Sequence, residues 1–475
     1  MSPFVFVIFG GTGDLARNKL LPALFSLFKA SRLGKQFYII GFSRRDLSDA
    51  AYAEMVRKEL SASDDPQWNA FARNIYYQQG MFDNEDGYKA LIERLNSFDT
   101  SVGACITRVF YLATPPDNYE SILHYLDKTK LSEGCGQGSE KWTRVAIEKP
   151  FGRDLETAQT LEKKVRSIFD EKQVYRVDHY LGKETMRNMI AFRFANSIFE
   201  PTWNHKYIDH VQITWAEKEG VKTRGAFFES VGMLRDVGQN HLLQMLATVA
   251  MEQPNSFTKE CVRDARANAI HAIKLAKDAS VVRAQYEKYT EEKNVDPKSV
   301  TETFFAAKFF VDTPRFANVP FYVRAGKRMK RDLMEIKIVF KQTCHMLFKE
   351  YGCPETGNIL TIRIQPDEGI TLQVNAKEPG HDLSLQTVPL SFSYHETFGG
   401  HGADAYEKIL LDVLYGDQML FNRTDELESS WQLVTSILKQ WKKAESSAML
   451  PQYPQGSWGP DAAYALITKE GRKWL

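Results

Sequence analysis

Nine consecutive residues in the first half of the chain combine side chains that could bind a phosphorylated polyol. The run RVDHYLGKE at positions 176–184 contains a carboxylate, an imidazole, a phenol and an ammonium group, at Asp178, His179, Tyr180 and Lys183. Apolar residues follow at helical spacing, so the cluster should lie at a helix N-terminus, where free N–H groups and the helix dipole favour an anion. A helix cap with solvated charges is the structural alternative.

A glycine-rich turn follows the first apolar run of the chain, residues 4–9. It has the sequence GGTGDLA and can be written as GxGxxA or as GxxGxxA. Glycines permit a tight turn and a close approach of a pyrophosphate to the backbone, and the final small residue lets helix and strand pack closely. With a strand before it and a helix after it, the turn predicts dinucleotide binding rather than a structural glycine turn. The candidate cofactor residues here are Gly10, Gly11, Thr12, Gly13, Asp14 and Leu15.

The end of the second expected strand indicates which nicotinamide cofactor is bound. An acid at this place would accept from the ribose 2′-hydroxyl, whereas a cation would pair with a 2′-phosphate. Ser43, Arg44 and Arg45 stand there, which favours NADP over NAD, although the arginines could be solvated surface charges. Further along, Thr114 begins a turn at the carboxyl edge of the sheet, where ligands of open α/β folds bind.

Three further polar residues lie where catalysis could occur. Lys149 follows an expected strand and would lie where cofactor and substrate meet, unless it is an exposed strand-end lysine. His241 falls on the apolar stripe of an expected helix, a place more often taken by a satisfied core histidine. Glu217 closes an alternating strand pattern on the same face as apolar residues, where a carboxylate needs a partner.

Two kinds of pattern predict the elements that position these residues. Residues 1–177 alternate short apolar runs with amphipathic stretches, which is typical of βαβ units in a parallel sheet. Strands are expected at 5–9, 37–41, 109–113 and 145–148, and helices at 15–30 and 50–60. After residue 178 apolar and polar residues alternate, which indicates antiparallel strands. Such runs lie at 211–215, 321–324, 336–340, 360–364, 370–372 and 383–392, with helical patterns at 233–251, 264–288 and 404–414.

The expected fold is therefore an α/β Rossmann-type domain over residues 1–177, followed by an α+β domain over 178–475 with a large, mainly antiparallel sheet. The length of 475 residues agrees with two domains, because a single core rarely serves a chain of this size. The 61 basic and 60 acidic residues nearly cancel, so neither nucleic acid nor a membrane surface is expected as a partner. No apolar stretch approaches the ~18 residues of a membrane span, and no signal peptide is evident. A cytoplasmic location is expected.

The five cysteines show no CxxC pair and no metal-ligand spacing. They stand at Cys105, Cys135, Cys261, Cys344 and Cys353. Their odd number and their scatter predict no disulfide framework and no zinc site.

Four of these segments together make the chain resemble glucose-6-phosphate dehydrogenases along nearly its whole length. They are GxxGDLA at 10–16, EKPFG at 148–152, RIDHYLGKE at 176–184, with Val177 in place of isoleucine, and the family's catalytic helix at 236–241. The resemblance implies oxidation of β-D-glucose 6-phosphate at C1 to the 6-phosphogluconolactone, with NADP as acceptor. It also implies a homodimer or homotetramer built through the large sheet.

The resemblance implies a role for each matching residue. His241 would be the general base that removes the C1 hydroxyl proton, and Asp178 would orient it, so that no metal is needed. His179, Tyr180 and Lys183 would hold the sugar phosphate. The sugar hydroxyls would be held by Lys149, which also borders the cofactor, and by Glu217 and Asp236; Lys327 and Gln365 match further substrate residues, and Arg44 matches the arginine that binds the cofactor phosphate.

One departure and two alternatives remain. The family often has a second lysine shortly after the one at Lys327, and neither Lys330 nor Arg331 can be assigned to its place. The chain could be another NADP-dependent sugar or sugar-phosphate dehydrogenase, or a protein that senses NADP without catalysis. The second alternative predicts a damaged acid/base pair, yet Asp178 and His241 are both present.

Overall fold

The computed structural model describes residues 1–62, 64–135, 143–277, 281–399, 404–443 and 450–475. Contacts group the chain into two compact units. The first comprises residues 1–182, 258–263 and 403–424, and the second comprises residues 183–257, 264–402 and 425–475. The sequence predicts a domain boundary at residue 177, and this boundary stays a prediction.

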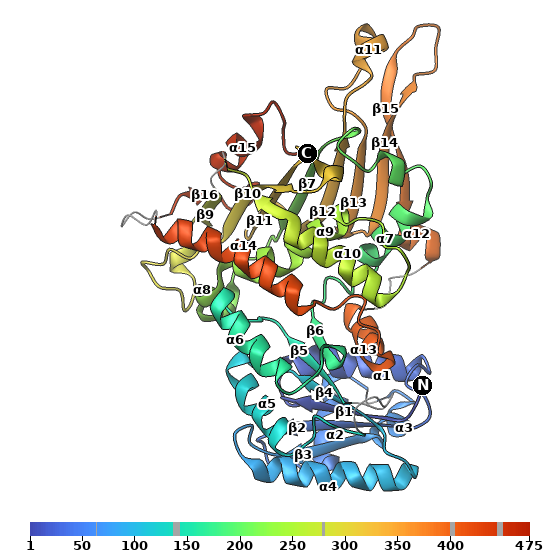
Figure 1. Cartoon of the computed structure of the whole chain (residues 1–475), viewed down its shortest axis with the longest axis vertical. Helices are drawn as coiled ribbons and strands as arrows, with labels where there is room; N and C mark the ends of the chain where they lie inside the picture. The colour runs from blue at the N-terminus through green and yellow to red at the C-terminus, as the bar shows by residue number, and fades with distance from the viewer. Residues whose placement is uncertain (63, 136–142, 278–280, 400–403, 444–449) are drawn as a thin grey trace. The chain divides into compact units, whose positions relative to one another are not determined.

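The first unit is built on a six-stranded parallel sheet (Figure 1). Its strand order, β3-β2-β1-β4-β5-β6, is that of doubly wound dinucleotide-binding folds, which confirms the predicted fold class. Strands β1 and β4 are buried along their whole length, as expected of central strands in a parallel sheet. The strands are β1 (Phe4–Phe9), β2 (Phe37–Ser43), β3 (Ile75–Gln79), β4 (Thr107–Leu112), β5 (Arg144–Glu148) and β6 (Val174–Val177).

Helices connect these strands and carry the apolar residues that complete the core of the unit. The predicted helix at 15–30 consists of a π-helical turn that continues into an α-helix, and the one at 50–60 forms as predicted. A helix from much later in the chain, α13, adds Ile409, Leu410 and Val413 to the same core. The helices are η1 (Ala16–Leu20), α1 (Leu21–Lys29), α2 (Asp49–Glu59), α3 (Trp68–Ala72), α4 (Glu85–Val102), α5 (Tyr119–Lys128), α6 (Leu155–Arg166) and α13 (Ala405–Tyr415).

The second unit contains a large sheet that is mainly antiparallel, as predicted. Its order is β15-β14-β13-β12-β7-β11-β10-β9-β16, with β8 pairing with β10; the pairs β7/β11 and β9/β16 are parallel. The strands are β7 (Ile208–Ala216), β8 (Ile273–Leu275), β9 (Val282–Tyr286), β10 (Phe304–Val311), β11 (Pro320–Gly326), β12 (Leu333–Phe340), β13 (Ile359–Gln365), β14 (Gly369–Lys377), β15 (Leu385–Ser393) and β16 (Gln452–Tyr453).

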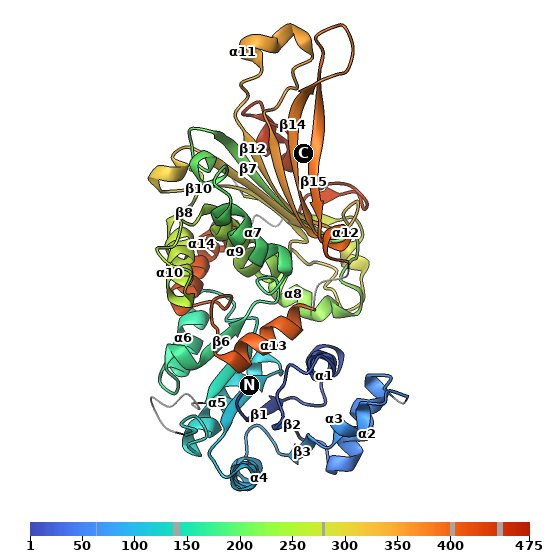
Figure 2. The same cartoon turned by 90° about the vertical axis from the view of Figure 1, so that its right-hand side faces the viewer.

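The two faces of this sheet have different neighbours. Val323 of β11 borders a small apolar cavity with Leu234 and Val434, whereas the guanidinium of Arg324 lies 4.2 Å from the ring centre of Trp474. Because successive strand residues point to opposite faces, one face is covered by helices and the other by the C-terminal segment. Figure 2 shows α9, α10 and α14 gathered beside the sheet. The helices are α7 (Glu184–Ala195), α8 (Gly225–Met233), η6 (Leu234–Leu242), α9 (Leu243–Ala250), α10 (Lys259–Ala272), α11 (His345–Phe348), α12 (Tyr394–Phe398), α14 (Thr424–Lys443) and α15 (Asp461–Thr468).

The helix predicted over residues 264–288 is wrong in its second half. Helix α10 ends at Ala272, and strands β8 and β9 follow, both paired with β10. The apolar residues of this stretch are compatible with either periodicity. Pairing with the buried strand β10 decides the outcome, because strand preference depends on the neighbours that a segment packs against.

The expectation that the cysteines form no disulfides is also wrong. Cys105 is bonded to Cys135 and Cys344 to Cys353, whereas Cys261 is in neither bond. The fold brings the paired Cα atoms to 6.0 and 5.9 Å, which is within the usual range for a disulfide. Sequence spacing does not reveal this proximity.

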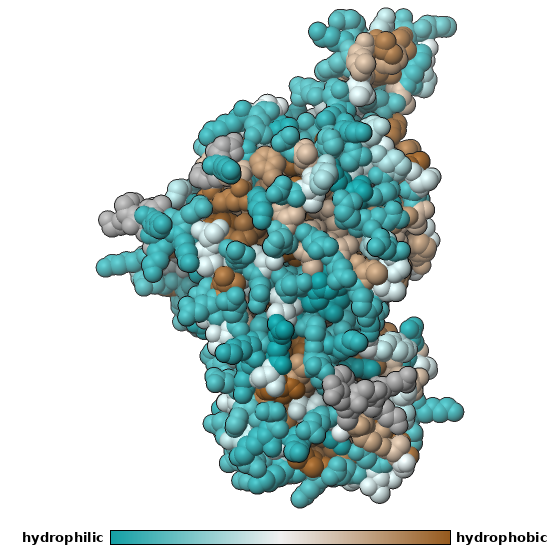
Figure 3. All heavy atoms as spheres, in the orientation of Figure 1, coloured by the Kyte–Doolittle hydropathy of each residue, from teal (hydrophilic) through white to brown (hydrophobic). Residues whose placement is uncertain are grey.

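Some large apolar side chains of the described residues are exposed. Figure 3 shows a mainly hydrophilic face with a hydrophobic group over α11, where Met346 and Leu347 are exposed. In the part of the chain that the structure describes, no helix has both the length and the apolar character that crossing a membrane requires.

Candidate active site

The glycine turn after β1 is shaped by close backbone packing. The amides of Gly10 and Gly11 both donate to the carbonyl of Phe42 at the end of β2, at 2.8 and 3.2 Å. Gly10 has a φ of +88°, and a β-carbon on it would lie 2.6 Å from the carbonyl oxygen of Ala113. A β-carbon on Gly11 would lie 2.5 Å from the Cα atom of Gly41. These two glycines therefore build the turn, which brings the start of the following helix to the carboxyl edge of the sheet, where a dinucleotide phosphate fits.

The other predicted cofactor residues lie along the same edge. Thr12 and Ser43 are buried and share a hydrogen bond of 3.0 Å between their hydroxyls. Arg44 is exposed directly after β2, and Thr114 is buried two residues after the end of β4. Asp14 is turned outward and forms an ion pair of 3.0 Å with Arg17.

Gly10→Ala is expected to lower both the thermal stability and the NADP affinity of the protein, because the added methyl group would displace the turn. Gly103→Ala is a matched control: Gly103 also has a positive φ, +72°, but a β-carbon there meets nothing within 4 Å. Thermal unfolding and NADP titration of both variants test this. Equal NADP affinity in the two variants would contradict the role given to the turn.

Lys149 follows a buried, hydrogen-bonded glutamate, Glu148, at the end of β5. The carboxylate of its neighbour Glu148 accepts hydrogen bonds from the hydroxyls of Tyr111, at 2.6 Å, and Tyr406, at 3.2 Å. Burial raises the pKa of Glu148, and the tyrosine hydroxyls act in the opposite direction by stabilising its charge. These hydrogen bonds to Glu148 fix the end of β5, which Lys149 follows.

The polar cluster at 176–184 begins in β6 and continues into the segment that follows it. Asp178 is 2% exposed, and its Oδ1 atom accepts the backbone N–H of Tyr180 at 3.0 Å. The ring of His179 lies against the rings of Tyr180 and Tyr406, with centroid distances of 4.3 and 6.1 Å. Lys183 is the N-cap residue of α7, which confirms that the cluster lies at a helix N-terminus.

A buried ion-pair network around Arg176 fixes the end of β6, just before Asp178. Arg176 is fully buried, and its guanidinium donates to Glu162 at 2.7 and 2.8 Å and to Glu171 at 2.9 Å. Thr424 joins the same network. Removing one partner from such a network is costly, because it leaves a buried charge uncompensated. Arg176 thus holds the strand end two residues before Asp178.

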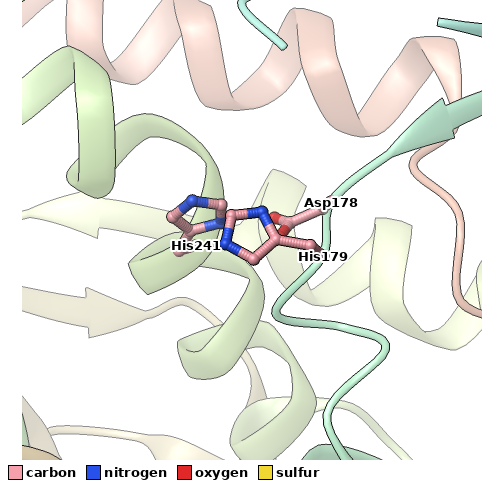
Figure 4. Close-up of side chains that lie close together, drawn as sticks. All are labelled: Asp178, His179 and His241. Atoms are coloured by element: carbon pink, nitrogen blue, oxygen red, sulfur yellow. The ribbon is translucent and has the colours of Figure 1, made fainter. Parts of the chain in front are cut away.

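His241 lies on the π-helical segment η6 in the second unit. Its side chain is 1% exposed, and its ring is stacked on that of Trp215, with a centroid distance of 5.3 Å and an angle of 7°. Glu302 holds the start of η6 by accepting the N–H of Leu234 at 3.0 Å, and burial raises the pKa of Glu302. Figure 4 draws His241 on this helix, and Asp178 and His179 on the segment after β6.

Glu217 has the partners that its apolar setting predicts. Its Oε1 atom accepts the indole N–H of Trp215 at 2.9 Å, and its Oε2 atom forms an ion pair with Lys327. The structure thus brings together Glu217 and Lys327, which are 110 residues apart in the chain. Asp236 lies half-buried in the first turn of η6. Gln365 ends β13, which is separated from β7 by β12.

Two residues next to these positions were not found from the sequence. Trp215 is in the same alternating run as Glu217, and this shared face is a signal that could have identified it. Tyr406 comes from α13, and nothing in its local sequence indicates that it lies between Glu148 and His179.

Comparison with known proteins shows the family to which the chain belongs. The family model described as "Glucose-6-phosphate dehydrogenase, NAD binding domain" matches residues 7–188, and "Glucose-6-phosphate dehydrogenase, C-terminal domain" matches residues 190–475. The chain belongs to the glucose-6-phosphate dehydrogenase family. It is 41% identical to the glucose-6-phosphate 1-dehydrogenase of Chlamydia pneumoniae, over 99% of this chain and 96% of that protein. It is 39% identical to glucose-6-phosphate 1-dehydrogenase 2 of Mycobacterium tuberculosis, over 99% and 94%.

Solved structures of the family have the same fold. A glucose-6-phosphate dehydrogenase in complex with its substrate glucose-6-phosphate has a TM-score of 0.91 and 34% identity, covering 100% of this chain and 99% of that one. The glucose-6-phosphate 1-dehydrogenase of Mycobacterium avium has a TM-score of 0.86 and 34% identity, covering 100% and 98%.

Proposed function

We propose that this protein is an NADP-dependent dehydrogenase that oxidises D-glucose 6-phosphate at C1 to 6-phospho-D-glucono-1,5-lactone. The observation that carries the proposal is full-length membership of the family, with both family domains matched between residues 7 and 475. The segments that could do the chemistry are all present: the glycine turn, Lys149, the polar cluster at 176–184 and the helix of His241.

His241 is proposed as the general base. It removes the proton of the C1 hydroxyl, and the hydrogen on C1 leaves as hydride, so that C1 becomes the carbonyl carbon of the lactone. An imidazole suits this role because its ordinary pKa, about 6.5, lies near the operating pH. Asp178 is proposed to orient the ring and to stabilise the imidazolium that forms.

The remaining polar residues are proposed to bind the substrate. His179, Tyr180 and Lys183 hold the phosphate, since N–H, O–H and ammonium donors together suit a dianion. The hydroxyls of the sugar are held by Lys149, Glu217, Asp236, Lys327 and Gln365.

NADP is proposed to bind along the carboxyl edge of the parallel sheet. A β-carbon on Gly10 or Gly11 would collide with backbone atoms, so glycines are needed to form the turn that would hold the pyrophosphate at the helix N-terminus. When bound, NADP supplies the nicotinamide ring that accepts hydride. Ser43 and Arg44 hold the 2′-phosphate of the cofactor, and Thr12, Thr114 and Lys149 border it.

Arg44→Ala is expected to weaken NADP binding by about tenfold or more and to leave NAD binding nearly unchanged, because only NADP carries the 2′-phosphate. Arg45→Ala is measured in parallel, because Arg45 is the next residue, is also exposed and is the other arginine that the sequence places at this strand end. The dissociation constants of NADP and of NAD are measured for both variants. Equal losses for NADP and NAD in Arg44→Ala would remove this assignment.

We also propose the roles of the two domains, the oligomeric state and the cellular location of the protein. Residues 1–177 form the NADP-binding domain and residues 178–475 the domain for substrate and assembly. The protein is a cytoplasmic homodimer or homotetramer. Light scattering of the purified protein measures the mass of the assembly, and a monomer would refute this part.

A further inference from the structure

We infer that Trp215 is a positioning residue. It holds two residues in place: His241, the proposed general base, and Glu217, which is proposed to bind the sugar hydroxyls. The inference rests on the proposed function, since it concerns how the two residues of that site are aligned. Three contacts of the Trp215 side chain and backbone, all within the second unit, carry the inference.

The first observation is that Trp215 stands on a rigid support. It lies near the end of β7, where its Cα partners are Ala325 on β11 and Met334 on β12. Its side chain is 2% exposed. Because β7 is hydrogen-bonded on both sides, the strand cannot shift without breaking two ladders. A functional group is held best when the element below it is fixed in this way.

The second observation is that the indole N–H orients Glu217. The N–H donates to Oε1 of Glu217 at 2.9 Å, while Lys327 takes Oε2. Lys327 is itself fixed, since its ammonium lies 5.1 Å from the ring centre of Phe228 and its carbonyl accepts the hydroxyl of Tyr453 at 2.6 Å. The carboxylate is therefore held from two sides in one orientation, with its remaining lone pairs available for a sugar hydroxyl.

The third observation is that the indole ring supports the imidazole of His241. The two rings are nearly parallel, at 7°, with centroids 5.3 Å apart. Both ring nitrogens of an imidazole lie in the ring plane, so stacking restricts rotation of the ring without using the nitrogens. The electron-rich indole face also favours the imidazolium that forms when the base takes a proton.

A purely structural role for Trp215 makes a different prediction. If the side chain only filled space, its N–H would not matter, and every smaller residue would lower stability in proportion to the volume lost. A positioning role predicts instead that the N–H affects substrate binding through Glu217 and that the ring affects the chemical step through His241.

The test compares Trp215→Phe with Trp215→Leu. Trp215→Phe keeps an aromatic face but has no N–H donor, so KM for glucose 6-phosphate should rise by about tenfold while kcat stays within about threefold of wild type. Trp215→Leu also loses the aromatic face, so kcat should fall by a further factor of about 10–100, the size expected for a misplaced base.

Two controls separate positioning from folding. Trp203→Phe is the matched control, because Trp203 is also buried and donates its indole N–H, at 2.8 Å to the carbonyl of Val249. It should lower thermal stability without changing KM or kcat. In a Glu217→Ala background, Trp215→Phe should raise KM no further, since residues that act through one another are not additive.

The outcomes are distinguishable from failure of the proposed function. Absence of glucose 6-phosphate turnover by the wild-type protein would remove the proposed function itself. In an active enzyme, an unchanged KM in Trp215→Phe, or equal kcat values for Trp215→Phe and Trp215→Leu, would overturn the positioning role. Thermal unfolding of each variant confirms that it is folded.

Discussion

His241→Ala is expected to lower kcat by about 10²–10⁴-fold, the usual contribution of a general base, while the KM for glucose 6-phosphate changes little. The reason is that an alanine cannot accept the C1 hydroxyl proton, whereas the groups proposed to bind the phosphate are untouched. Stopped-flow and steady-state kinetics with saturating NADP measure the loss. Thermal unfolding is needed beside them, because the side chain is buried against Trp215 and its removal leaves a cavity.

His271→Ala is the matched control for this experiment. His271 belongs to α10 in the same unit and is exposed, so its removal should leave kcat unchanged. If His241→Ala kept more than about a tenth of the wild-type rate, the assignment of the base would be refuted. A loss of less than about tenfold is smaller than the loss expected when a general base is removed.

Asp178→Asn is expected to produce the second large loss, a fall in kcat of about 10²–10⁴-fold by analogy with the acid of other acid/histidine pairs. The exchange keeps the shape of the side chain and an oxygen able to accept from the N–H of Tyr180. It removes the negative charge that would stabilise an imidazolium. Kinetics of the single and double variants measure the effect.

Two comparisons test the role of Asp178. Asp127→Asn, at an exposed aspartate of α5 in the same unit, should be neutral. Asp178→Asn should add little to His241→Ala, because residues that act as one catalytic group are not additive. Fully additive losses would show that Asp178 acts independently of the base.

Local patterns in the sequence predict the parts of the site that depend on neighbouring residues. The turn at Gly10 is recognisable because a buried strand precedes it and a helix follows it. The helix after Lys183 is recognisable from its spacing of apolar residues. The partner of Glu217 is predicted in kind, since a carboxylate on an apolar face needs one, but Lys327 is identified only through the resemblance.

Other features depend on residues that only the fold brings together. Arg176 is part of the polar cluster in the sequence, yet its side chain is buried in ion pairs with Glu162 and Glu171. The two disulfides and the strands after α10 have the same origin, because each is decided by a partner distant in the chain. Tyr406 reaches Glu148 across 258 residues of sequence.

The proposed activity is tested by steady-state kinetics of the wild-type protein with three compounds, glucose 6-phosphate, free glucose and 6-phosphogluconate, each with NADP and with NAD. We expect turnover of glucose 6-phosphate with a higher kcat/KM than either other compound, and with a preference for NADP. An active preparation that turned over another sugar but not glucose 6-phosphate would contradict it.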